Sequence, residues 1–147
     1  MKLQKNPKIL AIALSVVLLA STVFGCLWIL EKRDHSELEQ LCRYSAHRAC
    51  ERFGSYRDKD SGYDYDYGVS ELVSFYNSYM NLIIGETGST DTNCIYLNQL
   101  LGVLMKKPEL TAEQKNTLVM ITDQLSRDIY DVNVYDDIFF LYNQLRE

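Results

Sequence analysis

The chain is poor in the residues that interrupt helices and in those that carry chemistry. Its 147 residues include two prolines, seven glycines, two histidines and four cysteines. Neither His35 nor His47 belongs to an HExxH pair, and there is no GxSxG motif, no CxxC pair and no glycine loop followed by lysine. These absences argue against an enzyme, a zinc site and a nucleotide-binding loop, and no cofactor is expected.

An excess of basic residues is also missing, since the formal net charge is -5. A nucleic-acid partner requires a clustered basic surface to neutralise phosphates, so none is expected. Arg43, Arg48, Arg52 and Arg57 form a local basic run. We interpret that run as a solvated or salt-bridged helix face, because acidic residues outnumber it along the rest of the chain.

One long apolar run is present, from Ile9 to Leu30, and it contains no charged residue. A helix of about 22 residues is roughly 33 Å long, which is enough to cross the hydrocarbon core of a bilayer. Secretory signals have shorter apolar regions. Trp28, near the end of the run, is where an interfacial aromatic belongs. The pattern predicts an uncleaved transmembrane signal-anchor helix over residues 9–30, preceded by a basic N-terminus at 1–8.

Two other interpretations of this segment stay open. Val23-Phe24-Gly25-Cys26 resembles a bacterial lipobox, which would make Cys26 the lipidated first residue of a mature lipoprotein. Phe24 departs from that pattern, which prefers a small residue there. Simple cleavage at the small residues near Ala20 or Gly25 is the third option. The apolar residues 27–30 would make a poor start for either mature chain, so the anchor is favoured.

The flanking charges predict the orientation of the anchor. Lys2, Lys5 and Lys8 precede the span, whereas Lys32 and Arg33 follow it. The positive-inside rule therefore favours a cytoplasmic N-terminus. Residues 31–147 would then form a domain outside the cytoplasm, attached to the cell membrane by a single pass.

The soluble part reads as an all-α fold of about four to five amphipathic helices in a small bundle, because apolar residues recur at helical spacing and none of the segments alternates like a strand. The expected inward side chains of the second helix are Leu72, Val73, Tyr76, Met80, Ile83 and Ile84. Asp91 or Thr92 is expected to cap the third helix, and Thr111 to Gln114 to form a capping box. The expected helices cover residues 36–53, 69–84, 92–107, 112–129 and 133–145.

Residues 54–68, GSYRDKDSGYDYDYG, are predicted to form an acidic, tyrosine-rich loop. Its tyrosines are candidates for partner binding, because aromatic side chains bury a large area at a small entropic cost. Its carboxylates are weaker candidates for a calcium site, since the glycine and glutamate positions of an EF-hand are not matched. The partner-binding candidates are Tyr63, Tyr65 and Tyr67, and the metal candidates are Asp58, Asp60, Asp64 and Asp66.

Three cysteines lie beyond the apolar run. Cys42 and Cys50 are about 12 Å apart along one helix, too far to bond to each other. Either of them could pair with Cys94 in an oxidising compartment, and reduced thiols are the alternative.

These observations predict a membrane-anchored, non-catalytic helical domain that binds a protein partner or serves as an accessory component of an envelope assembly. The alternatives are an extracytoplasmic ion or ligand sensor that uses residues 58–66, or a lipoprotein lipidated at Cys26. The sequence does not identify the partner.

Overall fold

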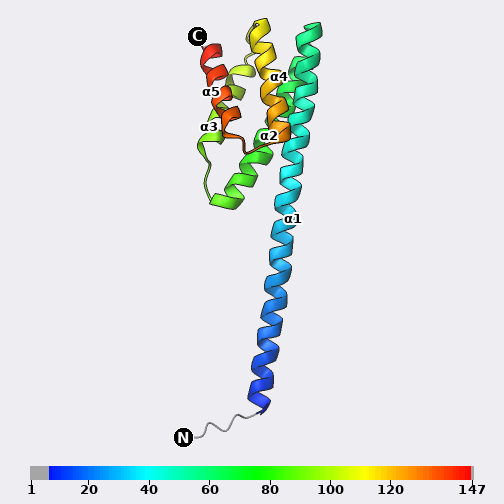
Figure 1. The fold of residues 1–147 in the computed structure, drawn as a ribbon, viewed down its shortest axis with the longest axis vertical. Helices are drawn as coiled ribbons and strands as arrows, with labels where there is room; N and C mark the ends of the chain where they lie inside the picture. Colours follow the sequence, from blue (N-terminus) through cyan, green and yellow to red (C-terminus); the bar gives the residue numbers. More distant parts are fainter. Residues whose placement is uncertain (1–6, 147) are drawn as a thin grey trace. The chain divides into compact units, whose positions relative to one another are not determined.

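The computed structural model describes residues 7–146, except for the side chains of residues 7–20, 26–31 and 33. Within that range the regular structure is helical and contains no strand, which confirms the all-α prediction (Figure 1). The chain divides into two compact units, Met1–Ser36 and Glu37–Glu147. The helices are α1 (Pro7–Lys59), α2 (Gly62–Thr87), α3 (Thr92–Leu104), α4 (Ala112–Arg127) and α5 (Val132–Arg146).

The first unit contains the apolar run that was predicted to cross a membrane. Among the residues that the structure describes, none of the helices is long and apolar enough to do so. The predicted transmembrane helix at 9–30 is therefore not supported by the structure. Cys26 and most other side chains of that run lie outside the described residues.

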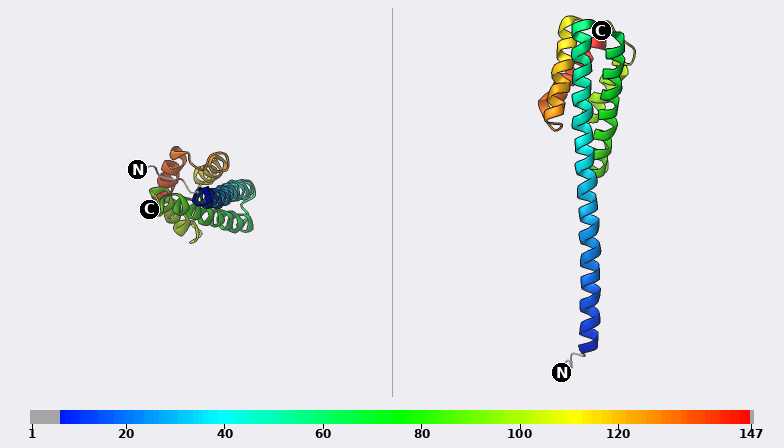
Figure 2. Two further views of the ribbon diagram at one scale, coloured as in Figure 1. Left: turned by 90° about the horizontal axis from the view of Figure 1, so that it is seen from below. Right: turned by 90° about the vertical axis from the view of Figure 1, so that its right-hand side faces the viewer.

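The second unit is a bundle formed by residues 37–59 of α1 together with α2, α3, α4 and α5. Successive helices run in opposite directions (Figure 1). The α1–α2 connection, the α3–α4 loop and the end of α5 therefore lie at one end of the bundle. Within the bundle, this part of α1 lies between α2 and α4 (Figure 2). This confirms the predicted helical bundle.

The part of α1 in the bundle packs through small side chains. Cys42, Ser45, Ala46 and Ala49 are buried, and Phe53 is the first large side chain of this stripe. These positions follow the i, i+3, i+4 spacing of one helix face. Because these side chains are small, the neighbouring helices can pack close to the backbone of α1.

The predicted loop at 54–68 is wrong, because most of it is helical. α1 continues through Gly54 to Lys59, and α2 begins at Gly62. Only Asp60 and Ser61 separate the two helices. Asp60 has a left-handed conformation with φ 51°, and the side chain of Ser61 caps α2 by accepting a hydrogen bond from the backbone N–H of Asp64 at 3.4 Å. Polar composition suggested a loop, but these side chains cover the outer faces of two packed helices.

The expected helix caps are present. Thr111 and Gln114 form the predicted capping box, with each side chain accepting from the other's backbone N–H. Asp91 caps α3 by accepting from the N–H of Cys94 at 2.8 Å. The end of α2 follows from Gly88, whose φ of 73° closes the helix in the left-handed conformation that glycine adopts without strain.

The inward face of α2 differs from the prediction. Phe75, Tyr79 and Leu82 are buried, whereas Ile84 is 40% exposed. Tyr65 and Val69 belong to the same buried stripe. The helix begins at Gly62, seven residues before the predicted start at Val69. The core also includes aliphatic side chains of the later helices: Leu97, Leu100, Leu101, Leu104, Leu118, Ile121, Leu125, Ile129, Val134, Ile138 and Leu141.

Phe53 of α1 packs directly against α2 at Gly68. A Cβ atom at this position would lie 2.8 Å from Cε1 and 2.9 Å from Cδ1 of Phe53. Those distances are shorter than van der Waals contact, so the ring of Phe53 occupies the space that any other residue would need for its side chain. Glycine is required here because of its size.

We expect Gly68→Ala to lower the free energy of unfolding of the full-length chain by about 1–3 kcal/mol, because the added methyl group overpacks the contact with Phe53. Denaturant titration followed by circular dichroism measures this change. Gly102→Ala is the matched control, since no atom lies within 4 Å of its Cβ position in α3. The free energy of unfolding of that variant should be unchanged or higher by up to about 1 kcal/mol. Equal effects of the two substitutions would contradict the packing argument.

Candidate protein-binding face on helices α1 and α2

Two of the predicted partner-binding tyrosines lie together on the surface of α2. Tyr63 and Tyr67 are one helical turn apart, and their ring centroids are 5.5 Å from each other. Tyr63 is 66% exposed and Tyr67 is 38% exposed. Their rings therefore present aromatic surface to solvent.

Arg52 of α1 packs against this aromatic surface. The guanidinium carbon of Arg52 lies 4.9 Å from the ring centroid of Tyr67, which is a cation–π distance. Arg52 also forms an ion pair with Asp64 of α2 at 3.2 Å. One arginine thus connects the two helices and covers one face of a tyrosine ring.

A similar arrangement is found one turn earlier on α1. Arg48 forms an ion pair with Glu71 of α2 at 3.0 Å. It also donates a hydrogen bond to the hydroxyl of Tyr44 at 3.1 Å and lies 5.7 Å from the centre of that ring. Tyr44 is 58% exposed, and Leu41, one turn earlier on α1, is 51% exposed.

We call these side chains the tyrosine–arginine face. Tyrosine and arginine are enriched at protein interfaces and among the residues that contribute most to binding energy. The ion pairs fix the arginines before binding, which lowers the entropy that a partner must remove. The face consists of Leu41, Tyr44, Arg48, Arg52, Tyr63 and Tyr67.

The third predicted tyrosine has a different position. Tyr65 points to the opposite side of α2 from its two neighbours and is 5% exposed. Its hydroxyl donates a hydrogen bond to the carbonyl of Leu104 at 2.6 Å, and burial raises its pKa. Its ring also packs edge-on against Tyr56 at 5.1 Å. Tyr65 is therefore a core residue and not an exposed contact residue as predicted.

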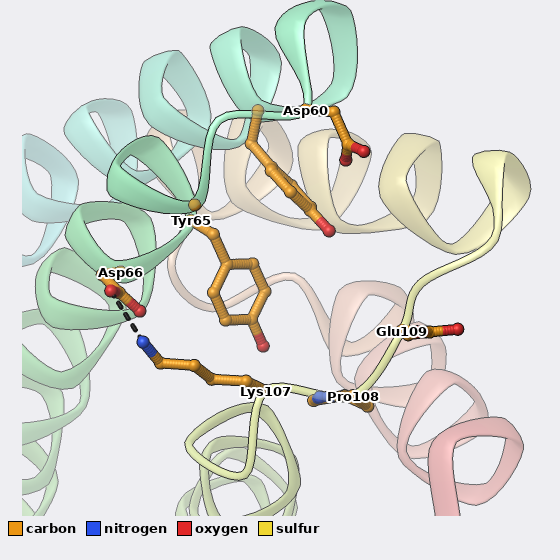
Figure 3. Close-up of a pocket in the computed structure, with 8 residues that line it drawn as sticks. Asp60, Tyr65, Asp66, Lys107, Pro108 and Glu109 are labelled. Atoms are coloured by element: carbon orange, nitrogen blue, oxygen red, sulfur yellow. Dashed lines mark hydrogen bonds and ion pairs between the residues drawn. The ribbon is translucent and has the colours of Figure 1, made fainter.

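A small cleft lies beside Tyr65 at the end of the bundle (Figure 3). Its volume is about 260 Å³, and its walls come from the end of α1, the start of α2 and the α3–α4 loop. Asp66 and Lys107 form an ion pair across it at 2.8 Å. Its lining contains no histidine, cysteine, serine or threonine: Tyr56, Asp60, Gly62, Tyr65, Asp66, Lys107, Pro108 and Glu109.

The four metal candidates do not converge, because each carboxylate is paired with a different basic residue. Asp58 accepts from Arg57 at 2.8 Å, and this hydrogen bond lowers its pKa. Asp60 pairs with Lys115, Asp64 with Arg52, and Asp66 with Lys107. In the part of the chain that the structure describes, no group of three or more His, Cys, Asp or Glu side chains is placed to hold a metal ion.

The three cysteines beyond the apolar run are free thiols in this structure. Cys42 and Cys94 are buried, and desolvation raises the pKa of Cys42 to about 12 and that of Cys94 to about 11. Cys50 points toward α4, where its sulfur lies 3.7 Å from the carbonyl oxygen of Val119. Neither Cys42 nor Cys50 is bonded to Cys94, so the disulfide remains a prediction from the sequence.

The basic run of α1 behaves as the sequence indicated. Arg43, Arg48, Arg52 and Arg57 each form an ion pair with a carboxylate. Sequence reasoning missed that two of these arginines also contact tyrosine rings. The signal was present in part, because Tyr44 and Arg48 are one helical turn apart, but the approach of Arg52 to Tyr67 depends on how two helices pack.

Comparisons with known proteins give no relative for this chain: no family model, no curated protein and no solved structure matches it. The candidate site therefore rests on the residues themselves.

We expect Tyr65→Phe to lower the free energy of unfolding by about 0.5–1.5 kcal/mol, because it removes a buried hydrogen bond to the carbonyl of Leu104, which still accepts from the N–H of Lys107 at 2.9 Å. Tyr63→Phe is the control, since that ring is largely exposed and should unfold like the wild type. Denaturant titration of the two full-length variants measures the difference. A Tyr65→Phe variant as stable as Tyr63→Phe would contradict this assignment.

Millimolar calcium should leave the melting temperature of the protein unchanged. Each acidic side chain between Asp58 and Asp66 is already neutralised by a basic side chain, which calcium would have to displace. Thermal unfolding with and without calcium, with magnesium as the control, measures this. A rise of several degrees that is specific to calcium and is abolished by Asp60→Asn would restore the sensor interpretation.

Proposed function

We propose that this protein is a membrane-anchored, non-catalytic helical domain that binds a protein partner, either as an adaptor or as an accessory component of an envelope assembly. The tyrosine–arginine face makes the contact. The observation that carries this proposal is the set of exposed tyrosine rings, Tyr44, Tyr63 and Tyr67, fixed by arginines that are themselves held in ion pairs.

The energetics of such a face favour protein binding. A tyrosine has two side-chain torsions, so its immobilisation costs little entropy for the area that it buries. The charges of Arg48 and Arg52 are matched by Glu71 and Asp64. A partner therefore meets aromatic planes and phenol hydroxyls, and it does not have to supply a neutralising charge.

The cleft at the bundle end offers few groups for catalysis. A hydrolytic or transfer site needs a nucleophile beside a base, and the lining of this cleft offers neither a hydroxyl of serine or threonine, nor a thiol, nor an imidazole. Its lysine is held by Asp66 at 2.8 Å. The hydroxyl of its buried tyrosine, Tyr65, donates a hydrogen bond to a backbone carbonyl.

The membrane anchor and the location of the domain outside the cytoplasm are proposed from the sequence. They rest on the uncharged run 9–30 and on the basic residues that precede it. Lipidation at Cys26 is the alternative means of attachment. The intact mass of the purified protein separates the two, because a lipoprotein would begin at a diacylglyceryl-modified Cys26 and would lack residues 1–25.

A photo-crosslinking amino acid at Tyr63 should yield a covalent adduct with one defined protein in the native membrane, because this ring is the most exposed tyrosine of the proposed contact. Introducing Tyr44→Ala and Tyr67→Ala into the same chain should reduce the adduct about tenfold or more. Truncating an interface tyrosine that is a hot spot costs about 2 kcal/mol or more of binding free energy, and about 1.4 kcal/mol corresponds to a tenfold change in affinity. Mass spectrometry identifies and quantifies the product.

The crosslinker at Tyr130 serves as the matched control, because Tyr130 is 41% exposed and lies in the α4–α5 connection at the other end of the bundle. It should give no defined adduct. If Tyr63 and Tyr130 capture the same products equally, or if the alanine variants leave the adduct unchanged, the tyrosine–arginine face is not the binding surface.

A further inference from the structure

A second surface of the bundle differs in kind from the tyrosine–arginine face. Helices α3 and α5 pack side by side (Figure 1), and α3 contains no charged residue from Thr92 to Leu104. Large apolar side chains of these two helices are exposed: Ile95 by 50%, Phe139 by 40%, Phe140 by 61% and Val132 by 68%. A charge-poor surface with exposed aromatic side chains is typical of the centre of a protein interface.

Five of the seven exposed residues of α5 follow the spacing of a two-helix contact, and Asn133 and Phe140 lie beside them. Val132, Asp136, Phe139, Asn143 and Arg146 alternate four and three residues apart along α5, and all five are exposed. We call them the α5 seam. Such 4-3 spacing is what places side chains of one helix against those of a second helix. The ring of Phe139 is held by stacking on Tyr96 of α3 at 4.6 Å, so the seam has a fixed aromatic centre.

The charges of the seam indicate which helix covers it. Asp136 and Arg146 are its two charged residues, and they lie toward opposite ends of α5. If two α5 helices met in parallel, each charge would face its own copy and repel it. In an antiparallel pair, the second copy presents the seam positions in reverse order. Asp136 then faces Arg146 of the second copy, and Phe139 faces Asn143.

We infer that the α5 seam is a self-association surface, on which α5 of a second copy of this chain packs antiparallel. Phe139 and Phe140 form the centre of the contact, and two symmetry-related ion pairs between Asp136 and Arg146 close its ends. The net charge of the chain is -5, so two copies repel each other in general. The seam is self-complementary, because its positive and negative groups exchange places in the two-fold pair.

The seam and the tyrosine–arginine face share no residue, so one copy can bind another through α5 and still present α1 and α2 to a different protein. The inference does bear on the proposed anchor, because the antiparallel pair puts the residue-37 ends of the two bundles at opposite ends. It therefore joins copies that are not anchored in the same membrane through residues 9–30.

Sedimentation of the full-length chain in detergent micelles tests the inference, because micelles do not constrain the direction of the N-terminal segments. We expect the wild type to show a monomer–dimer equilibrium. Asp136→Arg and Arg146→Asp should each raise the dimer dissociation constant about tenfold or more, since each places like charges opposite one another. The double variant, in which both charges are exchanged, should recover dimerisation. Both seam positions are exposed, so these substitutions leave the core intact.

Phe140→Asp should also weaken the dimer, because Phe140 is 61% exposed and lies beside Phe139 at the edge of the seam, whereas Met120→Asp should not, because Met120 is 44% exposed on α4. A wild type that stays monomeric over the accessible concentration range would overturn the inference. So would a dimer that the charge reversals leave unchanged, or one that the double variant does not rescue. Loss of the dimer in the Tyr44→Ala, Tyr67→Ala chain, with the seam intact, would place self-association on the other face.

Discussion

The contact between Phe53 and Gly68 controls how the first two helices of the bundle meet. Because Gly68 has no side chain, the ring of Phe53 lies against the backbone of α2. On the outer side of the same two helices, Arg48 and Arg52 of α1 pair with Glu71 and Asp64 of α2. The guanidinium of Arg52 also lies over Tyr67. The outer face of α1 and α2 is thus a consequence of packing on their inner faces.

Much of the fold follows from local sequence signals. The Thr111–Gln114 capping box and the Asp91 cap involve residues within one turn of each other, and both are present as expected. The segment 54–68 was misassigned because its composition is polar and its tyrosines alternate with acids. In a helix, that alternation puts Tyr63 and Tyr67 on one face and Tyr65 on the other. The inward face of α2 was also misassigned, so that Ile84 was placed inside and Phe75 and Tyr79 were not.

The candidate site was less predictable than the fold, because it is assembled from two helices. Tyr63 and Tyr67 were identified from residue type alone, but nothing in their neighbourhood along the chain indicates that Arg52 covers one of them. The carboxylates between Asp58 and Asp66 looked like a cluster of ligands in the sequence. In the structure Asp60, Asp64 and Asp66 are paired with basic residues of other elements, namely Lys115, Arg52 and Lys107. Asp58 pairs with its neighbour Arg57, so the four carboxylates do not form one group of ligands.

The hydroxyl of Tyr65 joins two positions that are 39 residues apart in the chain. Its acceptor is the carbonyl of the last residue of α3, where the chain turns toward α4. A hairpin of α1 and α2 that formed by itself would leave this phenol in water, and the carbonyl of Leu104 would lose one of its two donors, the other being the N–H of Lys107 at 2.9 Å. Closing the intervening segment has an entropic cost that increases only slowly with its length, so the separation of 39 residues adds little to the cost of this contact. The hydrogen bond therefore ties the start of α2 to the end of α3, and local opening of either element removes a contact from the other.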